Sequence, residues 1–190
     1  MKIILASSSP RRKELLKLIG LEPEIIEPKV EEFIEMEEKS LDFLKRLTIL
    51  KGKSVYINEY FNFIIISSDT IVLLKNKIIG KPKDREDAFS ILRALSNNVH
   101  EVWTGVSIIY KGKTYFDYAK TKVFFEEITD DEIDCYLDNE DYLDKAGAYA
   151  IQGRASVFVK KIEGCFFNVM GFPLNLFFNM LKNIGINIYK

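Results

Sequence analysis

The residues most capable of chemistry lie in the first loop of the chain, between an apolar run and an amphipathic helix. The apolar run covers 3–6, and a cluster of hydroxyl and basic residues follows it: Ser7, Ser8, Ser9, Pro10, Arg11 and Arg12. This order is typical of a strand, a tight loop and a helix start, with Ser9 as the N-cap and Pro10 as the first helical residue. Backbone N–H groups, hydroxyls, the positive end of the helix dipole and two guanidiniums then meet at one point, which predicts a phosphate-binding site.

This loop differs from two widespread phosphate-binding loops. It lacks the Gly-Lys-Ser/Thr of a Walker A motif, and no glycine precedes Gly20, which excludes a dinucleotide-binding fingerprint. The alternative interpretation is an ordinary capped helix with arginines on its surface. The residues of the loop alone leave both interpretations open.

Asp69 is the carboxylate that most suggests catalysis. It lies in Ser68-Asp69-Thr70, directly after the apolar and aromatic run 61–67. A carboxylate at the end of a buried strand is costly unless it is paired or bound to a metal. A turn or cap aspartate is the alternative interpretation.

Three further polar residues are candidates for substrate contacts. Lys51 lies on a helix whose other face is apolar, where a solvated lysine is the default interpretation. Lys81 is held between a glycine and a proline on a stiff loop, which suits a phosphate contact. Gln152 is followed by Gly153, whose small backbone allows a ligand to approach closely.

His100 is the single histidine of the chain. A Ser-His-Asp triad would have to use it, but no nucleophile elbow accompanies it. We therefore expect a core or surface histidine with no part in nucleophilic catalysis.

Periodicity and turn signals predict the elements that position these residues. Strands are expected at 3–6, 61–67, 71–74 and 156–162, with a hairpin of 102–110 and 114–127, and helices at 10–20, 42–55, 84–96, 129–138 and 173–185. Asp84 and Thr129 are predicted N-caps, and Glu132 would complete a capping box with Thr129. Strands and helices mix without strict βαβ alternation, which predicts an α/β domain with a mixed sheet.

Length and charge restrict the class of protein. The 190 residues fit one domain, 1–190, with two lobes around a central cleft. A net charge of −1 gives no global field toward nucleic acid or membrane, so neither is an expected partner. The apolar start is too short for a signal peptide, and no stretch approaches the roughly 20 apolar residues of a membrane span.

Cysteines and acidic residues add two expectations. Cys135, within a predicted helix, and Cys165, within a predicted strand, have no metal-ligand spacing and are expected to be buried, inert thiols. A cytoplasmic, reduced environment follows. Eight glutamates lie between Glu22 and Glu38; most are expected on a solvated face, and one or two could face a metal.

Several short blocks of sequence form a set that runs in order along nearly the whole chain. They are Leu5-Ala6-Ser7-x-Ser9-Pro10-Arg11-Arg12, Val30-Glu31-Glu32, Leu47-x-x-x-Lys51, Ser68-Asp69-Thr70-Ile71-Val72, Gly80-Lys81-Pro82, 102–106, 144–153 and 168–174. This set resembles the signature of the Maf family of nucleoside-triphosphate pyrophosphatases. The first block and the Lys145-Ala146-Gly147 block are the most specific, and the latter resembles the subgroup that acts on dTTP and UTP.

The resemblance implies a fold, an activity and a cofactor. The fold would be a mixed twisted sheet in two lobes, similar to that of the inosine triphosphate pyrophosphatases, with the nucleotide in the cleft. The activity would be hydrolysis of dTTP and UTP to the monophosphate and pyrophosphate, with water as the nucleophile. A divalent metal, Mg or Mn, would be the cofactor, and the oligomeric state stays open between a monomer and a homodimer.

The resemblance also implies roles for individual residues. Asp69 would be the general base and a metal ligand, with Glu32 as its acidic partner in catalysis and metal binding. Cations and a hydroxyl would hold the triphosphate: Ser7, Arg11, Arg12, Lys51 and Lys81. Thr70 and Gln152, together with Arg11, occupy positions tied to substrate choice. Fixed cations and a metal would stabilise the charge that gathers on the phosphate oxygens.

The chain departs from the family pattern at three places. Asn97-Asn98 replaces a usual Gly-Arg or Gly-Lys and removes a cation, whereas Gly52 in place of Ala and Ala150 in place of Gly each change one methyl. Two other functions stay as alternatives. One is a hydrolase of modified or purine nucleotides on the same fold, and the other is a non-enzymatic regulatory binding protein linked to septum formation.

Overall fold

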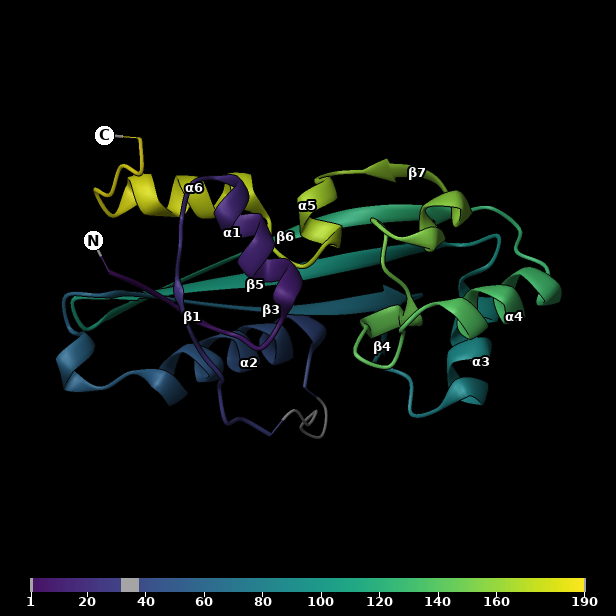
Figure 1. The fold of residues 1–190 in the computed structure, drawn as a ribbon, viewed down its shortest axis with the longest axis horizontal. Coiled ribbons are helices and arrows are strands. Elements are labelled where there is room, and N and C mark those ends of the chain that lie inside the picture. Colours follow the sequence, from purple (N-terminus) through teal and green to yellow (C-terminus); the bar gives the residue numbers. More distant parts are fainter. Residues whose placement is uncertain (1, 32–37, 190) are drawn as a thin grey trace. The chain divides into compact units, whose positions relative to one another are not determined.

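The fold is a mixed α/β arrangement of strands and helices, seen in a computed structural model that describes residues 2–31 and 38–189 (Figure 1). The strands are β1 (Ile3–Ala6), β2 (Glu24–Ile26), β3 (Ile64–Leu74), β4 (Lys77–Ile79), β5 (Val99–Tyr110), β6 (Lys113–Phe125) and β7 (Val159–Glu163). The helices are α1 (Pro10–Leu18), α2 (Ser40–Val55), α3 (Arg85–Leu95), α4 (Asp130–Asn139), α5 (Phe166–Val169) and α6 (Leu174–Asn183). Short 3₁₀ helices are η1 (Asn58–Tyr60), η2 (Ala146–Ala148) and η3 (Arg154–Phe158).

Within the described part of the chain, seven strands form one mixed sheet in the order β2-β1-β3-β5-β6-β7, with β4 paired to β3. Strand β1 is parallel to both β2 and β3, and Ala6 is in register with Ser67 of β3. The β3–β4 and β6–β7 pairs are antiparallel. Lys111 and Gly112, both with positive φ, make the two-residue turn between β5 and β6, as expected for a hairpin of this length.

The chain divides into two compact units. Unit 1 comprises the described residues of Met1–Asp69, Thr104–Ala119 and Gly171–Lys190, and unit 2 comprises Thr70–Trp103 and Lys120–Met170. The sequence likewise predicts two lobes, and the cleft stays a prediction.

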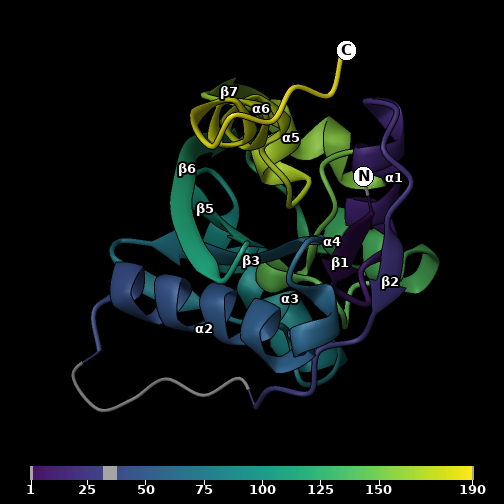
Figure 2. The ribbon, with the colours of Figure 1, turned by 90° about the vertical axis from the view of Figure 1, so that its left-hand side faces the viewer.

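In unit 1, helix α2 lies on one side of the strands and α6 on the other (Figures 1 and 2). Strand β1 contributes Ile4 and Ala6 to an apolar cluster that also contains Val55, Ile65 and Ile109. Because β1 lies between two parallel neighbours, its run is apolar on both faces, as strands inside parallel sheets are. The carboxyl end of β1 is therefore fixed in a dry interior, and residues 7–12, here named the serine–arginine loop, follow it directly.

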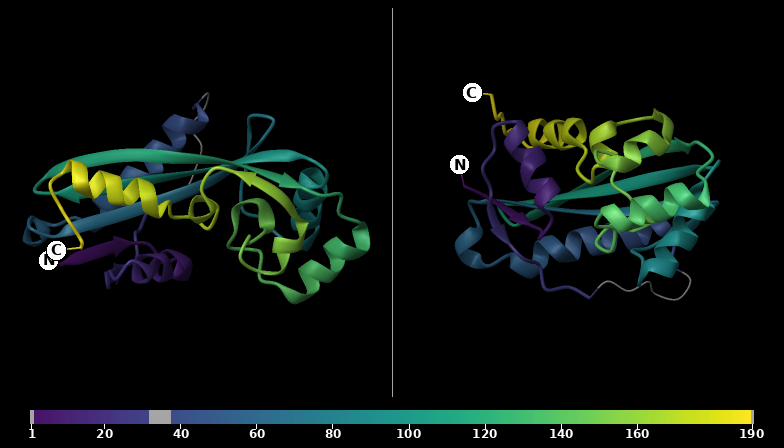
Figure 3. Two further views of the ribbon diagram at one scale, coloured as in Figure 1. Left: turned by 90° about the horizontal axis from the view of Figure 1, so that it is seen from above. Right: turned by 45° about the vertical axis from the view of Figure 1, so that its right-hand side comes forward.

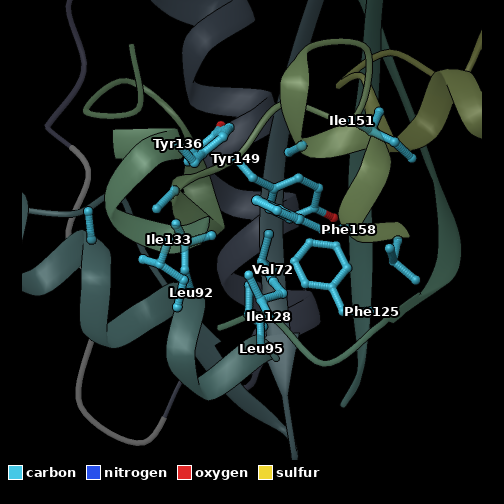
Figure 4. Packing of buried hydrophobic residues seen from close by; sticks show 14 of the residues in the cluster. Val72, Leu92, Leu95, Phe125, Ile128, Ile133, Tyr136, Tyr149, Ile151 and Phe158 are labelled. Carbon is cyan, nitrogen blue, oxygen red and sulfur yellow. The ribbon is translucent and has the colours of Figure 1, made fainter. Parts of the chain in front are cut away.

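In unit 2, helices α3 and α4 pack together beside η2 (Figure 3). Their apolar faces join a buried cluster that includes Leu92, Leu95 and Ile133, together with aromatic rings from later segments (Figure 4). Phe125 and Tyr149 meet edge to face with ring centroids 5.0 Å apart. This cluster anchors the segment 145–153 that carries Gln152.

The three predicted N-caps are confirmed in position, and two of them also make the capping hydrogen bond of the side chain. Asp84 Oδ1 accepts from Asp87 N at 2.9 Å, and Thr129 and Glu132 form the reciprocal capping box that the sequence predicts. Ser9 is at the N-cap of α1, but its side chain makes no capping hydrogen bond.

Four expectations from the sequence are wrong in detail. The strands predicted at 61–67 and 71–74 are one strand, β3, which begins only at Ile64. The strand predicted at 156–162 begins only at Val159, because η3 occupies the residues before it. Cys165 is a half-buried N-cap of α5 rather than a strand residue, and its N–H donates to Thr121 Oγ1. Cys135 is exposed on α4, not buried.

No helix among 2–31 and 38–189 has the length and apolar character needed to cross a membrane.

Candidate active site

The serine–arginine loop of unit 1 is organised around the Ser7 hydroxyl. Ser7 directly follows β1 and is buried. Its Oγ accepts hydrogen bonds from Ser9 N at 3.2 Å and from Arg12 Nη1 at 3.3 Å. The Ser7 hydroxyl therefore fixes both the loop backbone at Ser9 and the side chain of Arg12 in the first turn of α1.

Arg12 is held by a second contact, to a segment far along the chain. Its Nε donates to the Gly171 carbonyl at 3.0 Å, and Ser68 Oγ donates to the same carbonyl at 3.3 Å. This chain of hydrogen bonds links the loop after β1 to the residue next to Asp69. Arg11, in the same helical turn, is half-buried. The two arginines lie in the first turn of α1, which begins at Pro10 as predicted, and Arg12 has a fixed orientation.

Asp69 and Lys51 form a buried ion pair in unit 1. Lys51 Nζ lies 2.7 Å from Asp69 Oδ1, and the two residues are 7% and 8% exposed. The default interpretation of Lys51 as a solvated lysine is wrong, because α2 turns this residue toward the sheet. The turn or cap interpretation of Asp69 is also wrong, since β3 continues through it to Leu74.

The register of the sheet explains why these residues gather. Ala6 of β1 is opposite Ser67 of β3, so Ser7 and Asp69 both follow the same registered pair on neighbouring parallel strands. The parallel pairing ends here, because β1 ends at Ala6 while β3 continues alone through Asp69; positions at the carboxyl end of a parallel strand such as β1 are where α/β proteins bind ligands. Unit 1 thus holds Ser7 with Arg12 and Lys51 with Asp69, and the Gly171 carbonyl links the first pair to the residue before Asp69.

Three further predicted site residues, Thr70, Lys81 and Gln152, belong to unit 2. Thr70 is half-buried and follows Asp69 in β3, whereas Lys81 and Gln152 are exposed. The loop of Lys81 is hydrogen-bonded to the segment Lys145-Ala146-Gly147, because Gly147 N donates to the Gly80 carbonyl at 3.1 Å. Gly147 has a φ of +77°, a conformation that glycine adopts without strain.

Glu32 falls outside the described residues, so its predicted role as the acidic partner stays a prediction. Among residues 2–31 and 38–189 no group of three metal-binding side chains occurs. One buried carboxylate at Asp69 still fits a magnesium-type ion. Such ions take one or two carboxylates and fill their other positions with water and substrate phosphates.

The polar contacts that support the site are not predicted by the sequence. Ser67 Oγ donates to the Thr48 carbonyl of α2, and the Gly171 carbonyl accepts from Arg12 and from Ser68, the residue before Asp69. Gly171 lies in one of the family blocks, which was the available signal. Nothing in the sequence marks Ser67, because serine in a buried strand has no periodic signature.

His100 is a core residue, as expected, and is 1% exposed. Its Nε2 lies 2.8 Å from the Tyr149 hydroxyl, and Phe125 contacts its ring edge to face. Burial lowers the pKa of His100 from 6.5 to about 4 and raises the pKa of Tyr149. His100 therefore stays neutral near pH 7 and braces the residue three positions before Gln152.

Comparison with solved structures first defines the class of fold. The Ham1 protein of Staphylococcus aureus superposes with a TM-score of 0.53 over 96% of this chain and 99% of that chain, at 16% identity. The predicted mixed α/β fold class is confirmed. At this level of identity the likeness concerns the fold alone.

Comparison with sequences then defines the family. The family model described as Maf-like protein matches residues 2–184, so the chain belongs to the Maf family. A Bacillus thuringiensis protein named dTTP/UTP pyrophosphatase is 44% identical over 187 residues, which cover 98% of this chain and 97% of that protein. A Thermoanaerobacter protein of the same name is 45% identical over 184 residues, 96% of each chain.

Proposed function

We propose that this protein is a nucleoside-triphosphate pyrophosphatase that converts dTTP and UTP to the monophosphate and pyrophosphate. The observation that carries the proposal is the buried Lys51–Asp69 pair, at 2.7 Å, beside the ordered serine–arginine loop of unit 1. The names of the relatives that are 44–45% identical over nearly the whole chain support the same activity.

In the proposed reaction a water molecule attacks the α-phosphorus. Asp69 accepts the proton of the water, and the oxygen that bridges the α- and β-phosphates leaves with its electron pair as pyrophosphate. One base suffices because water is the nucleophile, so no serine or cysteine nucleophile is needed. A general base of this kind typically contributes about 100- to 10,000-fold in rate.

The cations would bind the triphosphate and stabilise its developing charge. Arg12 is oriented by Ser7 and Gly171 before substrate arrives, so its charge needs little reorganisation during the reaction. Arg11 and Lys51 would bind from unit 1 and Lys81 from unit 2. Thr70 and Gln152 would contribute to the choice of base.

Asp69 and Glu32 would hold a divalent metal, Mg or Mn. The metal would supply positive charge against the phosphate oxygens. Because few protein oxygens would bind this ion, an excess of chelator should remove it. Without added metal, hydrolysis should then fall to background. Full activity after exhaustive chelation would remove the metal from the proposal.

The proposal also covers organisation and location. We treat 1–190 as one Maf domain, with the two units as its lobes, and place it in the cytoplasm. Its substrates are intracellular metabolites, and both cysteines are free thiols, which suits a reducing compartment. The expected partner is a nucleotide substrate, and neither nucleic acid nor a membrane is expected to bind. Analytical ultracentrifugation distinguishes a monomer from a homodimer.

A substrate panel tests the proposal. Purified protein is assayed for kcat/KM with dTTP, UTP, CTP, dATP, GTP and ITP under one metal concentration. Preference for dTTP and UTP supports the proposal. Preference for ITP or another purine would favour a hydrolase of modified purines, and no turnover of any nucleotide would favour a regulatory binding protein.

A further inference from the structure

Helix α2 approaches strand β3 in unit 1 more closely than a side chain at Gly52 would permit. A β-carbon added at Gly52 would lie 2.8 Å from Ser67 Oγ, a separation that real β-carbons essentially never show. Ser67 is fully buried, and its hydroxyl donates a 2.7 Å hydrogen bond to the Thr48 carbonyl. In an α-helix the N–H of residue 52 points at that same carbonyl. The Ser67 hydroxyl therefore occupies the space that a methyl group at position 52 would need.

This contact runs beside the ion pair of the candidate active site. Ser67 and Asp69 are two residues apart on β3 and so face the same side of the sheet. Thr48 and Lys51 are three residues apart on α2 and are neighbours on the helix surface. The hydrogen bond between 67 and 48 and the ion pair between 69 and 51 therefore join the same two elements at adjacent positions.

Two adjacent contacts restrain a helix in a way that one cannot. A single ion pair leaves α2 able to slide and rotate on β3 while the long Lys51 side chain follows. A second, short contact made by the Ser67 hydroxyl to a backbone carbonyl fixes both the distance and the rotation of the helix. The backbone of Lys51 is then held in place, and its amine reaches Asp69 in one geometry.

We propose that Ser67, together with the absent side chain at Gly52, is a positioning residue for Lys51 and Asp69. The inference rests on the proposed function, in which Asp69 is the general base. Ser67 touches neither substrate nor metal in this role; it acts through the placement of α2. A displacement of about 1 Å in a catalytic group can cost roughly 100-fold in rate, so a methyl group at position 52 should matter.

The first test adds the methyl group and then removes the hydroxyl that it meets. Gly52→Ala should lower kcat by roughly tenfold or more, with a smaller change in KM, because the methyl displaces α2. Gly52→Ala/Ser67→Ala should be faster than Gly52→Ala, because the clashing Oγ is gone, but it should reach only the lower-than-wild-type rate of Ser67→Ala, because the hydrogen bond to the Thr48 carbonyl is lost with it. Alanine is a better helix former than glycine, so an effect confined to the helix itself would stabilise Gly52→Ala and leave kcat unchanged.

Ser54 provides a matched control on the same helix. Its hydroxyl donates a 2.9 Å hydrogen bond to the Lys51 carbonyl, but from the exposed side of α2. Ser54→Ala should leave kcat within about twofold of the wild type, since surface changes of this kind have small effects. Wild-type kcat in Gly52→Ala, or a double variant no faster than Gly52→Ala alone, would overturn the proposal.

A second measurement separates this inference from the proposed function. Crystal structures of the wild type, Ser67→Ala and Gly52→Ala give the Lys51 Nζ–Asp69 Oδ1 distance without any assay. We expect it to lengthen in Gly52→Ala or, if that variant does not fold, in Ser67→Ala. An unchanged distance in the variants that fold would overturn the positioning role even in an active enzyme. Absence of hydrolysis by the wild type would instead contradict the proposed function.

Discussion

The two units hold their candidate residues in different ways. In unit 1, Lys51, Asp69 and Arg12 are tied to their neighbours by short contacts, and the first two are nearly excluded from solvent. In unit 2, Lys81 and Gln152 are exposed on loops above a well-packed aromatic core. Groups that act at the reacting phosphorus gain from a rigid, dry setting, whereas groups that bind the rest of the triphosphate or choose among bases can be carried on loops.

This contrast predicts that changes in unit 1 act mainly on kcat and stability, and changes in unit 2 mainly on KM and substrate choice. Loop residues away from buried contacts tolerate substitution with little effect on folding. Buried charged residues do not tolerate substitution, because removal of one member of an ion pair leaves the other charge buried without compensation. Four experiments, ordered from the largest expected effect, would sharpen or break the comparison.

Asp69→Asn should have the largest effect. The amide has nearly the same shape but cannot accept a proton as a carboxylate does, so kcat should fall by roughly 100- to 10,000-fold. Steady-state kinetics with dTTP measure the loss, and far-UV circular dichroism controls for folding. A folded variant with a near-normal rate would remove Asp69 from the mechanism.

Lys51→Ala and Lys81→Ala compare a buried with an exposed cation. Lys51→Ala should lower the free energy of unfolding by about 3 kcal/mol, because it leaves the Asp69 carboxylate buried without this partner. Lys81→Ala should change it by less than about 0.5 kcal/mol and should raise KM. Urea unfolding and kinetics measure both effects.

A third variant tests whether the instability of Lys51→Ala comes from the Asp69 carboxylate that stays buried. Lys51→Ala/Asp69→Ala removes both charges, so it should be more stable than Lys51→Ala alone. Equal stability of the single Lys51 and Lys81 variants would show that the two units do not differ in the way described.

His100 predicts how the stability of the unit 2 core depends on pH. The unfolded chain binds a proton on this residue near pH 6.5, but the folded protein binds it only near pH 4, because the ring is buried. Between these values the unfolded state holds more protons, so stability falls as the pH falls. The loss should reach about 3 kcal/mol at pH 4.

His100→Gln isolates this effect from the titration of carboxylates. The variant should show a flatter decline in unfolding free energy between pH 6.5 and pH 4, measured by denaturant unfolding at several pH values. Parallel pH profiles for the two proteins would contradict the assignment to His100.

Gln152→Ala should have the smallest effect, confined to substrate choice. A primary amide can both donate to and accept from the edge of a pyrimidine. A polar group left unpaired by the wrong base costs about 1–3 kcal/mol, so the ratio of kcat/KM for dTTP and GTP should narrow by roughly 5- to 150-fold. An unchanged ratio would mean that the base is recognised elsewhere.

Local signals in the sequence predicted most elements of both units. Asp84, Thr129 and Glu132 marked helix starts because capping depends on neighbouring residues alone. The runs before and after Asp69 marked strands at 61–67 and 71–74, but not that β3 passes through Asp69 and makes them one strand. The strand expected at 156–162 failed at its start, since Ala155 and Phe158 join the unit 2 core from a 3₁₀ turn.

The composition of the site could be predicted, but its geometry could not. Ser7, Arg12 and Asp69 carry chemistry in their own types and spacing. The pairing of Lys51 with Asp69, and of Ser67 with the Thr48 carbonyl, depends on how α2 packs on β3. That packing brings Gly52 so close to Ser67 that a β-carbon at position 52 would lie 2.8 Å from Ser67 Oγ. In the sequence, Gly52 is visible only as a glycine in place of the usual alanine of the family pattern.

The position of attack on the substrate tests the central claim most directly. Wild-type protein hydrolyses dTTP in water labelled with heavy oxygen, and the products are separated and analysed by mass spectrometry. The account predicts dTMP and pyrophosphate, with the label in the phosphate of dTMP and none in pyrophosphate. Formation of dTDP and orthophosphate, or label in pyrophosphate, would contradict attack of water at the α-phosphorus.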